Sequence, residues 1–154
     1  MALMLSGCAS QGVNPCDLLS LEEAQAFEPD IQGSVWHPAA TSRAGDNELC
    51  VWHDGADENL LMLFYFPSPA ADPADLVASG MSGREMQRLD IEGVGESASA
   101  GFSASGIDSG ARLGLFAARA NGKTIGLRAR NIHSVTEEKF QHLKRLASTV
   151  LARI

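Results

Sequence analysis

The chain is short of positive charge, of cysteine and of long apolar runs, and each shortage narrows the classes of protein to consider. It holds 12 Lys and Arg against 19 Asp and Glu, a formal net charge of −7 at pH 7. Binding to nucleic acid and electrostatic adhesion to anionic membranes both depend on clustered cations, so we expect neither as a partner. No stretch approaches the roughly 18 consecutive apolar residues that can span a bilayer.

Length and composition are typical of one globular domain. The 154 residues lie within the range of roughly 100–200 residues of an ordinary domain. A chain of this size buries about two-thirds of its unfolded surface on folding. Hydrophobic residues make up 45% of the chain and charged residues 20%, which is ordinary for globular proteins. We therefore expect a core that forms without a metal or other cofactor.

The first of three cysteines, Cys8, ends the stretch Leu5-Ser6-Gly7-Cys8. This stretch resembles the lipobox of bacterial lipoproteins, in which an aliphatic residue and two small residues precede a cysteine. In those proteins the cysteine receives a diacylglyceryl group and becomes the mature N-terminus, and two or more acyl chains then anchor the protein stably. The resemblance implies lipidation of Cys8 and a location in the bacterial cell envelope, on the extracytoplasmic side.

This interpretation divides the chain into three parts. Residues 1–8 are the shortened end of a signal peptide with its lipobox, because only five residues precede the small ones and none of the five is basic. Residues 9–15 form a polar tether that reaches at most about 25 Å, and residues 16–154 form a single domain. The residue after the cysteine is Ala9 and not Asp. In a host that has an outer membrane, this favours a location in that membrane. The alternative is a cytosolic protein in which the tetrapeptide is incidental.

The other two cysteines, Cys16 and Cys50, are a disulfide candidate, because exported domains oxidise such pairs. The bond would close a loop of about 34 residues and stabilise the fold by roughly 3–4 kcal/mol in the chain-entropy model. In a cytosolic protein the same residues would be two separate buried thiols. A metal site is disfavoured, since neither a CxxC pair nor a histidine cluster accompanies them.

Capping signals, apolar periodicity and turn residues predict an α+β fold. Strands are expected where β-forming residues lie between turn residues: 35–37, 51–53, 59–66, 86–91, 111–119 and 123–130. Helices are expected after capping signals: 21–27, 73–79 and a last helix that starts at the Ser134–Glu137 capping box and runs to the C-terminus. Antiparallel connections dominate, so we expect a mainly antiparallel sheet with N-terminal, middle and C-terminal helices packed on it.

Asn121-Gly122 is the favoured two-residue hairpin turn and sets a register for the last two strands. Phe116 then lies opposite Leu127, Leu115 opposite Arg128, and Leu113 opposite Arg130. The preceding stretch, 93–110, is dominated by Gly, Ser and Ala and shows no clear helix or strand pattern.

Four stretches together match a known pattern: Pro15-Cys16-Asp17-Leu18-Leu19, Cys50-Val51-Trp52, Gly93-Val94-Gly95-Glu96-Ser97-Ala98 and Leu146-Ala147-Ser148-Thr149-Val150-Leu151. In this pattern the chain resembles small bacterial cell-envelope lipoproteins of unknown function, best known from actinobacteria, whose domain is similar to the PsbP-like α/β sandwich. The resemblance covers most of 14–154. It implies that Cys16 and Cys50 are bonded, and it brings no catalytic residues.

Residues that could perform chemistry are sparse. The stretch Gly93–Ala98 fits G-x-G-x-x-A, but no apolar helix follows it to hold a pyrophosphate, so a turn between strands is the preferred interpretation. His37 and His53 both follow tryptophans on expected strands and would approach each other if those strands pair. With Asp54 or Asp57 they could bind a metal, and with Asp54 they could form an enzyme site, although exposed histidines at strand ends are the simpler interpretation. His133 and His142 are expected to face solvent.

Arg119, Arg128 and Arg130 form a candidate anion-binding cluster on the expected hairpin. Arg128 and Arg130 should project from one face, with Arg119 at its edge, and a glycan or a lipid headgroup would be a suitable ligand. The alternative is that these side chains cover apolar surface and pair with carboxylates.

From these observations we interpret the chain as a membrane-anchored, non-enzymatic binding or scaffold module of the bacterial cell envelope. Its partner would be an envelope protein, a lipid or a glycan. Two alternatives stay open. One is a periplasmic enzyme whose site is assembled from scattered residues such as His37, His53 and Asp54. The other is a cytosolic α+β domain.

Overall fold

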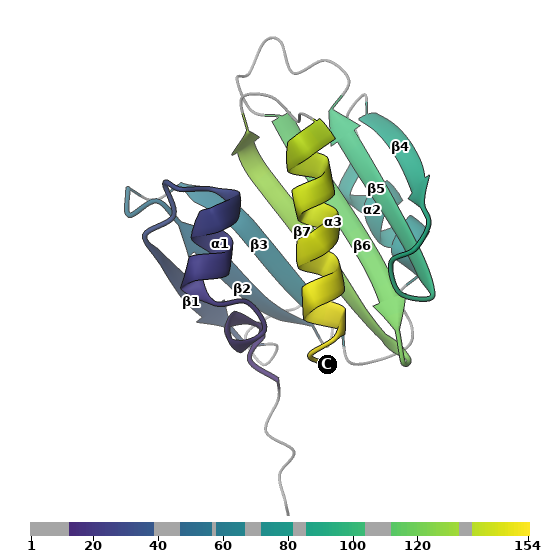
Figure 1. Cartoon of the computed structure of the whole chain (residues 1–154), viewed down its shortest axis with the longest axis horizontal. Coiled ribbons are helices and arrows are strands. Elements are labelled where there is room, and N and C mark those ends of the chain that lie inside the picture. Colours follow the sequence, from purple (N-terminus) through teal and green to yellow (C-terminus); the bar gives the residue numbers. More distant parts are fainter. Residues whose placement is uncertain are drawn as a thin grey trace, which may run out of the picture.

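The computed structural model describes residues 13–38, 47–56, 58–66, 72–81, 86–103, 112–132 and 137–154. Seven strands form one antiparallel sheet (Figure 1): β1 (Gly33–His37), β2 (Glu48–His53), β3 (Asn59–Phe66), β4 (Met86–Ile91), β5 (Ser97–Ser103), β6 (Arg112–Ala120) and β7 (Lys123–Ile132). Their order across the sheet is β1-β2-β3-β7-β6-β5-β4. The helical elements are η1 (Pro15–Asp17, a 3-10 turn), α1 (Leu21–Phe27), α2 (Pro73–Met81) and α3 (Glu137–Leu151). The expected α+β class is confirmed.

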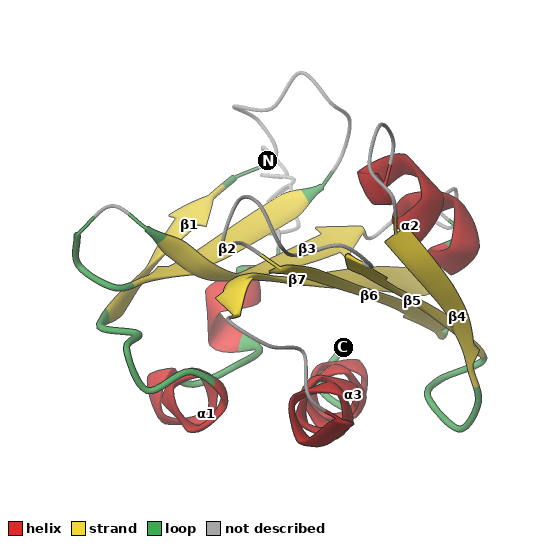
Figure 2. Ribbon diagram, turned by 90° about the horizontal axis from the view of Figure 1, so that it is seen from above, coloured by secondary structure: helices red, strands yellow, loops and turns green. Residues whose placement is uncertain are grey.

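Helices cover both faces of the sheet. Helices α1 and α3 lie on one face, called here the α1/α3 face, and α2 lies on the other, called the α2 face (Figure 2). Since paired residues of an antiparallel sheet share a face, the register assigns side chains to each. The α1/α3 face carries the main core, including Cys50, Leu61, Leu63, Phe116, Ile125 and Leu127. The α2 face carries Val51, Met62, Phe64, Leu115, Ala117 and Arg128.

The helix starts follow their capping residues. Ser20 Oγ accepts the Glu23 N–H at 3.1 Å while Glu23 Oε2 accepts the Ser20 N–H at 2.8 Å, a complete capping box for α1. Helix α2 extends through Gly80, beyond the expected end at 79. A Cβ at Gly80 would come within 2.7 Å of Leu115 Cδ1, so the missing side chain lets the helix lie directly on β6.

The hairpin forms as its sequence predicts, except at its open end. Asn121 and Gly122 have φ values of 54° and 72°, and the predicted pairs Phe116–Leu127 and Leu115–Arg128 are present. The predicted pair Leu113–Arg130 is wrong, because the register shifts between Arg112 and Gly114 and leaves Leu113 out of the ladder.

Strand β5 escaped prediction because Ser, Ala and Gly have low strand propensity. Ala98, Ser99 and Ala100 are nonetheless buried between β4 and β6. The Gly93–Ala98 stretch is the β4–β5 turn and the start of β5, as the preferred interpretation held. Its Gly95 has φ 58°, and a Cβ there would lie 2.4 Å from Arg119 O.

Candidate functional site

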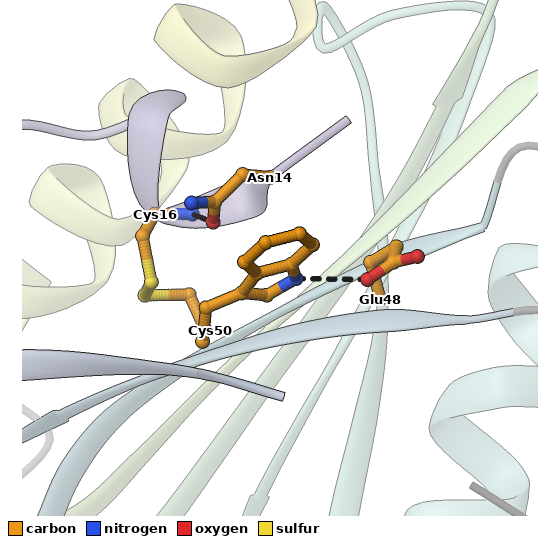
Figure 3. Close-up of a disulfide and its surroundings, with 5 residues drawn as sticks. Asn14, Cys16, Glu48 and Cys50 are labelled. Carbon is orange, nitrogen blue, oxygen red and sulfur yellow. Dashed lines mark hydrogen bonds between the residues drawn. A yellow bond between two sulfur atoms is a disulfide. The ribbon is translucent and has the colours of Figure 1, made fainter. Parts of the chain in front are cut away.

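A disulfide joins the N-terminal segment to the sheet. Cys16 Sγ of η1 and Cys50 Sγ of β2 are 2.00 Å apart, and the two Cα atoms are 5.1 Å apart (Figure 3). Cys50 is fully buried and Cys16 is partly buried. The predicted pairing is confirmed, so these residues are neither separate thiols nor a metal site.

The residues around Cys16 hold the same segment in place. Asn14 Oδ1 accepts the Cys16 N–H at 2.9 Å and caps η1. Leu18 and Leu19 are buried in the core, and Leu18 O accepts a hydrogen bond from Arg153 Nη1 at 2.7 Å. The first described residues are therefore fixed covalently, by packing and by the C-terminal end of the chain.

Ionic contacts join α1 to the C-terminal region. Arg153 binds Glu23 through two parallel hydrogen bonds of 2.8 and 2.7 Å. The Arg153 hydrogen bond, with the backbone N–H of Ser20, lowers the pKa of Glu23 to about 2. Lys139 of α3 donates to Phe27 O and lies 3.7 Å from Glu28 Oε2.

His142 is partly exposed, so the expectation that it faces solvent holds only in part. Its ring lies 5.4 Å from the Phe27 ring, edge to face at 78°. Burial lowers the pKa of His142, and the nearby charges of Arg145 and Lys139 lower it further. The other histidine of this expectation, His133, lies outside the described residues.

An exposed aromatic residue stands beside the disulfide. Trp36 on β1 pairs with Cys50 and so projects from the α1/α3 face. Its Nε1–H donates to Glu48 Oε2 at 2.8 Å, drawn as the dashed line in Figure 3, and the residue is 41% exposed. We did not predict a role for Trp36. The sequence places it on a strand but does not show that this strand is an edge.

The histidines proposed for an enzyme site are not brought together. Strands β1 and β2 do pair, but His37 lies opposite Leu49 and His53 opposite Gly33. His53 lies beside Gly33, which is four positions from His37 along β1, so the two histidines are about 13 Å apart along the strand.

The residues beside His53 build the β2–β3 turn. His53 Nδ1 accepts the Gly55 N–H, and Asp54 Oδ1 accepts the N–H groups of Ala56 and Glu58. Across the described part of the chain, no three His, Cys, Asp or Glu side chains are grouped so as to hold a metal ion.

The arginines of the candidate anion site share a face but are spread along it. Arg119 lies opposite Thr124, and Arg128 lies opposite Leu115, four positions away on β6. This separation is about 13 Å along the strand. Arg119 Nε is buried, with no hydrogen-bond partner among the described residues. Only the backbone of Arg130 is described, so an anion site at these residues stays a prediction.

The lipidation candidate Cys8 and most of the tether lie outside the described residues, which begin at Val13. Among the helices that the structure describes, none is long and apolar enough to cross a membrane. No family model, curated protein or solved structure matches this chain.

Proposed function

We propose that the chain is a lipid-anchored, non-enzymatic binding or scaffold module of the bacterial cell envelope, held on the membrane through Cys8. The observation that carries this proposal is the Cys16–Cys50 disulfide. Structural disulfides persist in oxidising compartments and are rare in the cytosol. The bond lies eight residues after the lipobox-like cysteine, so two independent features support export. The antiparallel sheet covered by helices supports the resemblance to PsbP-like envelope lipoproteins.

The disulfide also suits an anchored protein mechanically. A tether of seven residues, 9–15, reaches at most about 25 Å and leads directly into η1. Any pull on the anchor would pass from Cys16 to Cys50 on β2, a strand hydrogen-bonded on both sides. Without the bond, the same pull would act on the short η1, on the packing of Leu18 and Leu19 and on the hydrogen bond from Arg153 to Leu18 O.

Binding is favoured over catalysis because the residues proposed for an enzyme site are either held apart or engaged in backbone hydrogen bonds. His37 and His53 are held apart by the strand register. Asp54 accepts two backbone N–H groups within a turn. By contrast, the edge of the sheet presents an exposed tryptophan in a fixed orientation.

Intact-mass analysis of the protein from membranes of its native host tests the proposal. We expect added acyl mass on the peptide that contains Cys8, and a mass lower by two hydrogens for the linked Cys16–Cys50 peptides. A Cys8→Ser variant should move to the soluble fraction, whereas a Cys16→Ala/Cys50→Ala variant should stay on the membrane. Free thiols and an unmodified Cys8 would refute the assignment to the envelope.

A further inference from the structure

Charge is unevenly divided along the chain. Residues 1–83 contain 12 acidic residues and one cation, Arg43, whereas residues 84–154 contain 7 acidic and 11 basic residues. The net charges of −11 and +4 account for the −7 of the whole chain. Strands β1, β2 and β3, with η1 and α1, all come from the acidic part. In the described ranges 13–38, 47–56 and 58–66 there is no Lys or Arg.

The two outer strands of the sheet differ in how their edges are protected. Strand β4 carries Arg88 and Asp90, which form an ion pair at 3.6 Å. Charged residues at an edge discourage a further strand from pairing there. Strand β1 reads Gly-Ser-Val-Trp-His and has no Asp, Glu, Lys or Arg, and Val35 is 46% exposed. The edge at β1 is therefore the one suited to accept another strand.

Trp36 gives this edge a fixed aromatic anchor. Its indole is oriented by the hydrogen bond to Glu48, and the β2 residue opposite it, Cys50, is fixed by the disulfide. An aromatic ring that is already ordered loses little entropy on binding, and tryptophan is enriched among the residues that dominate interfaces. Its ring face also attracts Lys and Arg side chains.

Carboxylates stand at both ends of β1. Asp30 precedes the strand, and Asp54 follows β2 at the same end, where the Gln32 N–H donates to His53 O. Glu48 on β2 lies at the other end, next to Leu49, which pairs with His37, and Asp17 belongs to η1, which contacts β1 and β2. Among the described residues these four carboxylates have no ion-pair partner, whereas Glu23 and Glu28 are paired with cations of the C-terminal region. A five-residue strand spans about 17 Å, so one extended segment would meet both acidic ends.

We propose that β1 is the docking site for an extended, cationic segment of a partner protein, which adds to the sheet as an eighth strand. Main-chain hydrogen bonds to β1 would supply affinity, and Lys or Arg side chains beside Trp36 and the flanking carboxylates would supply specificity. The inference rests on the proposed binding function and names the class of partner. A second copy of this chain is a poorer occupant, since β1-to-β1 pairing would bring two strongly acidic regions together.

A synthetic peptide, Lys-Val-Lys-Val-Lys-Val-Lys with blocked ends, tests the proposal on the full oxidised chain. Two control peptides separate its parts. Replacing Lys by Glu reverses the charge, and replacing Val by Pro keeps the charge but prevents strand pairing. By NMR we expect the cationic strand peptide to shift the amides of 33–37 and to slow hydrogen exchange at the alternate amides of β1 that point away from β2, with a dissociation constant below about 1 mM at low salt. Binding should weaken severalfold as salt rises.

Matched variants locate the site. Trp36→Ala should weaken peptide binding at least tenfold, whereas Leu89→Ala, which removes a residue of similar exposure (38%) on β4, should leave it unchanged. Both variants should keep the disulfide and the melting temperature of the parent chain, because both residues are exposed.

Several outcomes would overturn the inference. The first is that millimolar peptide leaves the amide shifts of β1 unchanged, and the second is that either control peptide binds as tightly as the cationic strand peptide. The third is that the shifts centre on β4. The fourth is that, without peptide, the amides of β1 become more protected from hydrogen exchange as the protein concentration rises. The last would identify a second copy as the occupant. None of these results bears on acylation of Cys8, so failure of this inference and failure of the membrane-anchor proposal can be told apart.

Discussion

The two ends of the sheet are joined to their covering helices by different forces. On the β1–β2 side of the sheet lies α1, a helix of seven residues that buries only Ala24 and Phe27 (Figure 2). This end is fastened by the disulfide and by ionic contacts from α3 and Arg153. Strands β6 and β7 meet α3, a helix of fifteen residues with an apolar stripe: Leu143, Leu146, Ala147, Val150 and Leu151. No disulfide between described residues crosslinks this end.

The difference shows that a short helix needs contacts other than side-chain packing to stay on the sheet, whereas a long one does not. A helix as short as α1 is unstable alone in water, and two buried side chains offset little of the entropy lost on ordering it. Covalent and ionic contacts therefore supplement packing at the end of the sheet formed by β1 and β2. Packing is sufficient for α3. Substitutions at the two ends should consequently differ in size, in salt dependence and in pH dependence.

The largest effect is expected in the core beneath α3. Phe116→Ala removes a buried ring from the α1/α3 face and should lower the free energy of unfolding by about 4 kcal/mol. Urea unfolding followed by circular dichroism measures it, and exposed Leu89→Ala serves as the control, with a change within about 0.5 kcal/mol. A smaller loss for Phe116→Ala than for removal of the disulfide would contradict the contrast between the two ends.

Removing the disulfide should have the next largest effect. The double variant Cys16→Ala/Cys50→Ala leaves no free thiol at either position and should cost about 3 kcal/mol. Hydrogen exchange should show the earliest loss of protection in α1, while α3 stays protected as in the parent chain. Equal loss of protection in both helices would mean that the crosslink stabilises the whole sheet and not one end.

The ion pair between Arg153 and Glu23 should contribute less, and its contribution depends on pH. The folded pKa of Glu23, about 2, lies below its ordinary value of 4.5. The folded state therefore binds this proton more weakly than the unfolded chain does, and the stabilisation is full above pH 4.5 and is lost as pH falls toward 2.

Arg153→Ala should accordingly reduce the urea midpoint most above pH 4.5 and little near pH 2. Added salt should shrink the same difference. A deficit that is unchanged between pH 6 and pH 2.5 would show that Arg153 acts through its hydrogen bond to Leu18 O alone.

Local signals in the sequence predicted most of the elements, because they depend on neighbouring residues. The Ser20–Glu23 capping box and the Asn121-Gly122 turn fixed the start of α1 and the register of the hairpin. Strand β5 was missed, since its small side chains are buried by their neighbours and not by their own hydrophobicity. The disulfide was predicted from the number of cysteines and the inferred compartment.

Properties that depend on strand order could not be read from the sequence. Nothing local distinguishes Trp36 on an outer strand from Trp52 on an inner one, although the first is exposed and the second is buried. The same limit applies to His37 and His53, whose separation follows from the register of β1 against β2. The site proposed here is therefore a product of topology.

The smallest expected effect concerns His142, at the contact between α1 and α3. Its folded pKa lies below the ordinary 6.5, chiefly because burial disfavours the charged ring, and Arg145 and Lys139 add to this while Glu138 opposes it. Protonation thus favours the unfolded chain, and the stabilisation present above pH 6.5 is lost as pH falls through the lowered pKa.

Replacing the ring by an uncharged group of similar shape, as in His142→Phe, should remove this dependence. Between pH 7 and pH 5 the urea midpoint of the parent chain should fall more than that of the variant. Because Glu23 titrates only in more acidic solution, the two groups are separated by pH. A parent and a variant with parallel pH profiles would show that folding does not change the pKa of His142. The contact with Phe27 would then contribute to packing between α1 and α3 without sensing pH.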